Sequence, residues 1–502
     1  MSQTTPLQFG KWRSFFWPVH YYELKKLLPM FLMFFFISFV YSLLRNTKDA
    51  LIITAPGSGA EATNFLKVGG VVPAAAIYML IYAKLSNRLT KEKLFYAAIL
   101  PFIVFFILFA TVLYPAKDIL HPTVLADKFE AALPIGFSGL IASFRNWTYA
   151  LFYIFAELWG SFVLSLMFWG FANDITKVTE AKRFYALFGL GANLALMAAG
   201  PAAKFITHLQ VQAEFTGDPW QTSVNYLMAI STLSTLCIII IYWWINRHVL
   251  TDHMLYTPTE QIGTQKDKPK MALKDSFLFL VKSKYMLSIA ILVLAYNISI
   301  NLLEGTWKSQ LKLLYSDKAQ YLDFMGTYSM ILGATTIFMM LFVSSNVLRK
   351  FGWAITAYIT PLILFITGLG FFSFIIFKDF FSPLLFAWDT SPLMISVFFG
   401  TVQNIMSKAS KYSLFDPTKE MAYIPLDQES KVKGKAAIDT VGARLGKAGG
   451  SSIQIGLITT FGSLATVTPH IGIIMLFILA AWLWAIKDLD NREFKKIEKT
   501  VK

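Results

Sequence analysis

Residues 433–456 read KGKAAIDTVGARLGKAGGSSIQIG, and this stretch combines two features that normally exclude each other. Its glycines and alanines are typical of a membrane helix that packs closely against its neighbours. It also carries Arg444 and Lys447, which lie three residues apart and therefore on one helix face. A charge at membrane depth costs roughly 2.5–3.5 kcal/mol, so we expect both cations to face a watery cavity that accepts an anion. The alternative is an amphipathic helix at the membrane surface, with its cations in water.

The composition places this chain among polytopic membrane proteins. Of its 502 residues, 56% are hydrophobic and only 15% are charged, and phenylalanine alone occurs 46 times. The net charge of +15 would indicate a nucleic-acid partner in a soluble protein, but here we attribute it to the loops and expect no nucleic acid. Cys237 is the only cysteine, which excludes an internal disulfide framework. The six histidines show no metal-ligand spacing, so we expect neither a metal nor a cofactor.

Apolar runs near the 20 residues needed to cross a bilayer recur along the chain. They predict an all-α membrane protein with twelve transmembrane helices, roughly 29–53, 62–85, 94–114, 145–172, 181–207, 223–246, 276–304, 320–345, 352–375, 382–407, 435–462 and 466–486. We divide them into two six-helix halves, 29–246 and 276–486, joined by the polar linker 247–275 and flanked by the segments 1–28 and 487–502. Two such halves around a central cavity form a major-facilitator-like architecture.

Lysine and arginine concentrate in alternate connections and near both chain ends. By the positive-inside rule, this pattern predicts an even number of spans and cytoplasmic termini. We assign Lys26 to the N-terminal segment and Lys408 to the cytoplasmic connection after the tenth span. Arg45, Lys48, Lys308 and Lys312 are exceptions, because they lie at the predicted outer ends of the first and seventh spans.

Short matches relate the two halves. The first span ends in LLRNTK (43–48) and the seventh in LLEGTWK (302–308). The fourth span is followed by DITK (174–177) and the tenth by DPTK (416–419). Each match is short, but their common order indicates parallel repeats, as in major-facilitator transporters.

Further ionisable residues lie inside predicted spans. They are Lys67 in the second span, Glu157 in the fourth and Glu304 in the seventh, where Lys308 lies one turn on and can pair with Glu304. An intramembrane charge is a functional hypothesis by default. Lysine and arginine suit phosphate, and the amide of Asn193 lies in the fifth span. The alternative for both glutamates is a structural role as counter-charges.

Aromatic residues near these charges are interpreted mainly as lipid-facing or interfacial, with one or two available to stack on a base. They are Tyr41, Trp147, Tyr149, Tyr153, Trp159, Trp307 and Tyr315. GARLGK (442–447) is one residue shorter than a P-loop and lacks its Ser/Thr, so nucleotide hydrolysis is not expected. We find no constellation for covalent catalysis and predict a transporter, not an enzyme.

Several long runs resemble the ATP/ADP translocases of plastids and obligate intracellular bacteria. Among them are FAELWGSFVLSLMFWGFANDITKVTEAKRFYALFGLGAN (155–193), NLLEGTWKSQLK (301–312) and SLFDPTKEMAYIPLDQESKVKGKAAIDTVGARLGKAGGS (413–451). The resemblance covers nearly the whole chain. It implies a twelve-helix, major-facilitator-like fold and the import of host ATP in exchange for ADP, with phosphate accompanying the ADP. We also expect a monomer. The chain is similar to chlamydial members, which implies the bacterial inner membrane; the alternative is the plastid inner envelope.

The resemblance also implies functional residues. Two lysines and two glutamates of the family match Lys67, Lys447, Glu157 and Glu304, and Asn193 matches an asparagine linked to phosphate recognition. Lys435 is a rival for Lys447, because both lie in the same matched run. We expect the other intramembrane cations, Arg444, Arg45, Lys48 and Lys308, to line the same site. Some members import several nucleotides with protons, and this alternative stays open.

Overall fold

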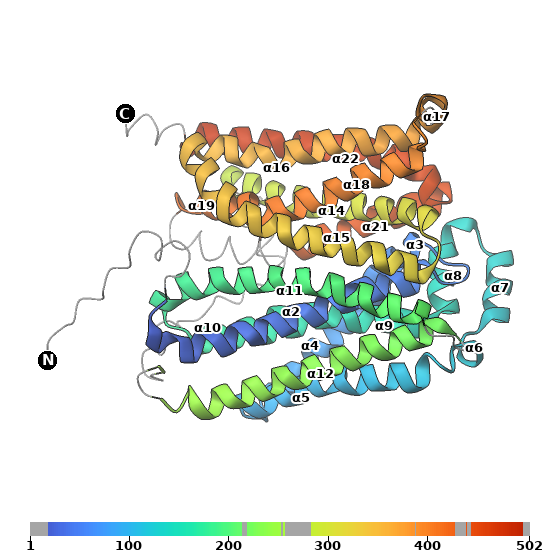
Figure 1. Ribbon diagram of the computed structural model, residues 1–502. Coiled ribbons are helices and arrows are strands. Elements are labelled where there is room, and N and C mark those ends of the chain that lie inside the picture. Colours follow the sequence, from blue (N-terminus) through green and yellow to red (C-terminus); the bar gives the residue numbers. More distant parts are fainter. Residues whose placement is uncertain are drawn as a thin grey trace, which may run out of the picture.

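The computed structural model describes residues 19–212, 218–252, 255–256, 283–386, 388–426, 438 and 443–494, and these residues form helices joined by short connections (Figure 1). Helices satisfy every backbone hydrogen bond within one segment, which a chain in lipid requires. Polar caps begin several of them. The side chains of Thr90, Asp218, Ser283 and Asp317 each accept a hydrogen bond from a backbone amide of the first turn.

The helices before the linker form one group, which we call the N-terminal group. Its membrane-length stretches are α2 (Leu24–Ile53), α3 (Ala60–Phe65) continuing through η2 (Leu66–Val71) into α4 (Val72–Ser86), α5 (Lys91–Leu108) with η3 (Phe109–Leu113), α9 (Trp147–Leu158) with η5 (Trp159–Phe168) and α10 (Trp169–Ile175), α11 (Val178–Gln212) and α12 (Pro219–His248). Three short helices, α6 (Lys117–Leu120), α7 (Thr123–Ala132) and α8 (Ser138–Arg145), connect α5 to α9.

The helices after the linker form the C-terminal group. They are α14 (Lys284–Leu314), α15 (Lys318–Phe338) with η7 (Met339–Val343), α16 (Ser344–Ile376), α17 (Lys378–Phe386), α18 (Pro392–Ser410) with η8 (Lys411–Phe415), α19 (Asp416–Ala422), α21 (Ala443–Phe461) and α22 (Leu464–Leu489) with η10 (Asp490–Phe494). Figure 1 shows the two groups side by side, with α11 and α2 facing α15 across the boundary.

The twelve predicted spans all coincide with helix in the described part of the chain. Ten of these helices are long and apolar enough to cross a membrane. The tenth and eleventh spans correspond to α18 and α21, which have 19 residues each. The predicted tenth span, 382–407, is wrong at its start, because α17 ends at Phe386 and a new helix begins at Pro392. Of the predicted eleventh span, residues 435–437 and 439–442 lie outside the described residues.

Several spans contain a π-helical segment, either within the span or at its end. The π-helical segments η2, η3, η5, η7 and η8 have five to ten residues each and continue directly from an α-helix. Such segments hold one additional residue per turn and occur frequently at functional sites. Lys67 lies inside η2, and Glu157 and Lys408 lie two and three residues before η5 and η8.

Small residues allow α11 and α15, one from each group, to pack closely. A Cβ atom on Gly200 would lie 2.3 Å from the carbonyl oxygen of Gly326, and one on Gly326 would lie 2.9 Å from that of Gly200. A Cβ on Gly333 would lie 2.7 Å from the carbonyl oxygen of Asn193. Within the described helices, this pair makes the most extensive contact between the two groups.

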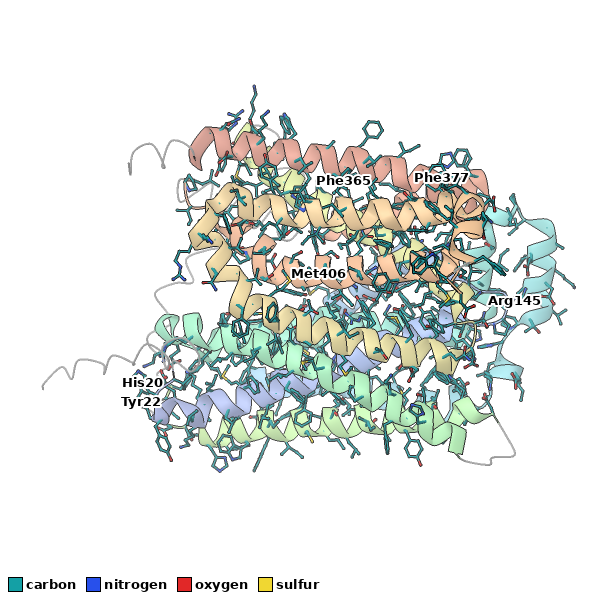
Figure 2. The ribbon with its side chains drawn as sticks, turned by 45° about the horizontal axis from the view of Figure 1, so that its top comes forward. His20, Tyr22, Arg145, Phe365, Phe377 and Met406 are labelled. Carbon is teal, nitrogen blue, oxygen red and sulfur yellow. The ribbon has the colours of Figure 1, made fainter. Side chains whose placement is uncertain are left out.

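The two ends of the bundle differ. Figure 2 shows His20 and Tyr22 at the end that we call the terminal end, and Arg145 at the opposite end, which we call the distal end. Arg145 contacts Asp127 and Glu130 at 2.5 Å each and so holds α7 against α8. At the distal end α3 packs against α14 and α21, and the Lys312 amine donates a hydrogen bond to the carbonyl oxygen of Ser58.

Lys26, which we assigned to the N-terminal segment, lies in the first turn of a membrane-length helix. Helix α2 begins at Leu24, and the Lys26 side chain is fully buried. Its Nζ lies 2.7 Å from Glu180 Oε2 and donates to the carbonyl oxygen of Leu255. A buried carboxylate partner therefore balances the charge of Lys26.

Candidate functional site

A chain of ion pairs begins in the N-terminal group. The Lys48 amine on α2 lies 3.1 Å from Glu157 Oε1 on α9 and 3.0 Å from Oδ1 of its neighbour Asp49. It also lies 3.7 Å from the centre of the Tyr153 ring. The side chains of Lys48 and Asp49 are only 2% and 1% exposed, so these charges depend on each other rather than on water.

The same chain of ion pairs continues in the C-terminal group. The Lys308 amine on α14 lies 2.7 Å from Asp49 Oδ2, across the boundary, and 3.0 Å from Glu304 Oε1 on its own helix. Lys408 on α18 reaches the same Glu304 oxygen at 3.4 Å and donates a hydrogen bond of 3.1 Å to the Tyr328 hydroxyl. The pairing of Glu304 with Lys308 confirms the expectation drawn from their spacing. We call these six residues (Glu157, Lys48, Asp49, Lys308, Glu304 and Lys408) the central ion chain.

Lys67 lies across the boundary from polar amides. Its Nζ donates a hydrogen bond of 2.7 Å to Asn301 Oδ1 on α14, and no carboxylate of the described residues lies within ion-pair distance of it. Nearby, Asn64 donates to Gln454 Oε1 at 2.6 Å, and Gln454 donates to the Leu302 carbonyl oxygen. A lysine held by a neutral oxygen keeps its charge available for an anion.

Arg45 lies on α2 one turn before the central ion chain. Its Nη2 atom is buried and has no hydrogen-bond partner among the described residues, and its guanidinium carbon lies 6.0 Å from the centre of the Tyr41 ring. An unsatisfied buried donor of this kind is costly, because guanidinium groups normally find oxygen acceptors. Arg45 and Lys67 are therefore the two cations of the described site whose geometry is most open to an anionic ligand.

The structure does not join every predicted site residue to this cluster. The Asn193 amide donates to the Gly189 carbonyl oxygen at 2.8 Å and lies 3.8 Å from the sulfur of Met340, in the contact between α11 and η7. Arg444 and Lys447 belong to α21, but their side chains lie outside the described residues, as does Lys435 altogether.

Sequence reasoning missed Asp49 and misplaced Lys408. In the sequence, Asp49 is one polar residue at the end of a span. Its two partners gave no helical spacing to recognise, because Lys48 is its neighbour in the chain and Lys308 is far away. Lys408 was predicted to lie in a cytoplasmic connection, and this prediction is wrong. It lies on α18, and its amine contacts Glu304. Two charged residues, Glu304 and Lys308, lie one turn apart in the seventh span. This charged pair could have indicated that a further cation, such as Lys408, contacts Glu304.

The lipid-facing interpretation is also wrong for four aromatic residues. Tyr153, Trp159 and Trp307 are fully buried, and Tyr149 is 2% exposed. The Trp159 indole donates to the Ile37 carbonyl oxygen, and the Trp307 indole donates to Thr401. Buried tryptophan and tyrosine normally find such partners, so these rings are part of the packing around the site.

The described site brings cations and carboxylates of both helix groups together at the boundary. Cations from both groups converge there, and nearby carboxylates can exchange partners with them. In the described residues, no three side chains of histidine, cysteine, aspartate or glutamate are arranged to hold a metal ion.

Comparison of the sequence with known families identifies its relatives. The sequence model of the TLC ATP/ADP transporter family matches residues 2–494. The chain belongs to this family of transporters. It is 56% identical to ADP,ATP carrier protein 1 of Chlamydia pneumoniae, over 98% of this chain and 96% of that protein. It is 50% identical to the chloroplastic ADP,ATP carrier protein 1 of Arabidopsis thaliana, over 93% of this chain and 74% of that protein.

Solved structures support the fold of this family member. The nucleoside transporter NupG aligns with a TM-score of 0.54 at 10% identity, over 92% of this chain and 99% of that one. A D-xylose–proton symporter aligns with a TM-score of 0.53 at 12% identity, over 93% and 97%. The transporter is therefore an all-helical membrane protein whose fold is that of major-facilitator transporters.

Proposed function

We propose that this protein exchanges ATP for ADP across a membrane by alternating access. The observation that carries the proposal is 56% identity, over nearly the full length of both chains, to a protein named as an ADP,ATP carrier. A buried site rich in lysine and arginine between two helix groups supports the same function, because both nucleotides are multiply charged anions.

In the proposed bound state, the nucleotide phosphates contact Lys67 and Arg45, the two cations whose amine or guanidinium has no carboxylate partner in the described site. Lys48 and Lys308 turn from their carboxylates toward the phosphates as these arrive. Arg444, Lys447 and Asn193 complete the site in our proposal. Glu157 and Glu304 neutralise the lysines when the site is empty, since an unpaired buried ammonium group is costly.

We propose further that a monomer in the bacterial inner membrane imports host ATP, with phosphate accompanying the exported ADP and both termini in the cytoplasm. Residues 29–246 and 276–486 move as units about the linker 247–275. ATP carries about one more negative charge than ADP, and moving one charge across 100 mV is worth about 2.3 kcal/mol. Phosphate that leaves with ADP offsets this difference.

Uptake of labelled ATP into proteoliposomes tests the proposal. Vesicles that contain the protein are either preloaded with ADP or left empty, and both are assayed with and without a proton uncoupler. We expect rapid uptake only into the preloaded vesicles, unaffected by the uncoupler. Equal uptake into both, abolished by the uncoupler, would instead indicate a proton-coupled importer. No ATP uptake by folded protein would contradict the proposed substrate.

Orientation is tested separately. A single cysteine is placed at Tyr22, near the terminal end, in a Cys237→Ser background, and intact cells are treated with a membrane-impermeant maleimide. We expect protection in intact cells and labelling after lysis. Labelling in intact cells would contradict cytoplasmic termini.

A further inference from the structure

The central ion chain divides unequally between the two helix groups. The N-terminal group supplies one lysine, Lys48, and two carboxylates, Asp49 and Glu157. The C-terminal group supplies two lysines, Lys308 and Lys408, and one carboxylate, Glu304. With all six side chains charged, the N-terminal part of the central ion chain carries a net charge of −1 and the C-terminal part a net charge of +1. The groups therefore attract each other through this chain, although the chain as a whole is neutral.

The central ion chain crosses between the groups, in the described residues, at one contact. This contact joins Asp49 Oδ2 to Lys308 Nζ at 2.7 Å, and both side chains are at most 4% exposed. Separating the groups here would leave Asp49 with Lys48 and Lys308 with Glu304, but it would leave a net negative charge on one buried side and a net positive charge on the other. Breaking a buried pair in this way is strongly unfavourable unless another charge replaces the lost partner.

Two other contacts between the helix groups near the distal end are hydrogen bonds to neutral acceptors rather than ion pairs. Lys312 donates to the backbone carbonyl of Ser58, one turn beyond Lys308, and Asn64 donates to the amide of Gln454. Neutral acceptors make both contacts, so a bound anion changes them little. The Asp49–Lys308 pair is different, because phosphate oxygens compete directly with Asp49 for the lysine.

We infer that Asp49 is a positioning residue that keeps the distal end closed until nucleotide phosphates occupy the lysines of the C-terminal group. This inference rests on the proposed function. A bound anion neutralises the net positive charge around Lys308, the attraction to Asp49 falls, and the groups separate at the distal end. An empty carrier stays closed there. Uptake from the distal side then requires nucleotide on the terminal side, which is one half of obligatory exchange.

Replacing Asp49 with asparagine tests this inference by transport. Asp49→Asn keeps the shape of the side chain and removes the attraction across the boundary. We expect ATP uptake into empty proteoliposomes to rise about tenfold above the native protein, which corresponds to a coupling of about 1.4 kcal/mol, within the range for contacting residues. Asp49→Glu, which retains the charge, should remain dependent on internal ADP.

Asp323→Asn is the matched control. Asp323 pairs with Lys204 across the same two helix groups at 3.5 Å, but these side chains are 37% and 35% exposed. Its removal should leave uptake dependent on internal ADP, because water already screens this pair. Uncoupled uptake in both variants would overturn the specific role of Asp49 and indicate general loosening of the boundary.

Accessibility of the distal end gives a second readout. Ser58 is 6% exposed, so Ser58→Cys in a Cys237→Ser background reports opening when a maleimide is added to protein in detergent. With Asp49 intact, saturating ADP should accelerate labelling. With Asp49→Asn, labelling should be fast without nucleotide. Equal labelling of the intact protein with and without ADP would overturn the inference, and this measurement needs no folded Asp49 variant.

The two proposals fail separately. If the native protein exchanges ATP for ADP but Asp49→Asn remains strictly dependent on internal ADP, the role of Asp49 is refuted and the exchange function stands. If the native protein transports no ATP into ADP-loaded vesicles, the proposed function fails first.

Discussion

Replacing Gly200 with alanine tests how closely α11 and α15 must pack. The new Cβ would lie 2.3 Å from the carbonyl oxygen of Gly326 and 3.1 Å from the Cβ of Met330. A carbon atom approaches a carbonyl oxygen to about 3.3 Å, so the two helices would have to move apart by about 1 Å at this point. Overpacking of this kind costs about 1–3 kcal/mol, and we expect Gly200→Ala to lower the free energy of unfolding by that amount.

Two other glycines make this prediction a graded series. A Cβ on Gly326 would lie 2.9 Å from the Gly200 carbonyl oxygen, a milder overlap, so Gly326→Ala should cost less. Gly170 is exposed on α10, and a Cβ there would meet no atom within 4 Å. Because alanine favours helix over glycine by about 1 kcal/mol, Gly170→Ala should stabilise the protein slightly.

The assay is unfolding of the purified protein in mixed micelles by SDS, followed by circular dichroism, together with ATP/ADP exchange in proteoliposomes. Since α11 and α15 join the two helix groups, we expect slower exchange for Gly200→Ala and unchanged exchange for Gly170→Ala. Equal unfolding free energies for these two variants would refute the argument that the groups touch through backbone atoms here.

Three further predictions concern single charges. Lys67→Gln keeps a hydrogen-bond donor for Asn301 but removes the charge, so the KM for ATP should rise by at least about tenfold in ADP-loaded vesicles. Glu304→Gln removes the carboxylate that Lys308 and Lys408 share, so the unfolding free energy in SDS should fall by about 3–5 kcal/mol. Burial alone would raise the pKa of Asp218, but hydrogen bonds from Lys117, the Trp220 amide and Tyr114 hold this pKa below its ordinary value. Native stability should therefore fall as the pH drops below about 4, and Asp218→Asn should lose less in the same range.

Each of these predictions has a direct control. Lys67→Arg retains the charge and should keep the KM closer to the native value than Lys67→Gln does; a native KM for Lys67→Gln would contradict the assignment. A Glu304→Gln variant as stable as the native protein would show that its two ion pairs contribute no net stability. Identical acid profiles for native protein and Asp218→Asn would contradict the stabilising role of the Asp218 carboxylate, whose contribution is present above its unfolded pKa and lost below it.

The spans were predictable because lipid imposes a simple rule on sequence. An apolar run of sufficient length has to become a helix, so 29–53 and 466–486 were found within a few residues of α2 and α22. The break between α17 and α18 was harder to predict, because Ser391 and Pro392 interrupt a run that is apolar on both sides. Hydrophobicity shows where helices are, and capping residues show where they begin.

The central ion chain was only partly predictable. Glu304 and Lys308 lie one turn apart, so their pair follows from helix geometry. Asp49 pairs with Lys308 from 259 positions away, and no local pattern signals a contact between distant segments. We predicted Lys408 in a cytoplasmic connection because a lysine near the end of a span usually lies in the loop that follows. In the described fold its amine instead contacts Glu304.

The π-helical segments have a consequence for how this chain can change in length. Each residue advances an α-helix by about 100°, so one inserted residue would rotate everything beyond it to a different face. A π-helical turn accommodates such a residue locally and leaves both flanking helices in place. Removing one residue from Leu66–Val71 would restore regular winding there and leave α3 and α4 in place, but it would change the direction of Lys67 within that turn. These turns therefore set the direction in which the side chains of the site point. Single-residue deletions inside them should be more harmful than deletions of equal size in the connections between spans.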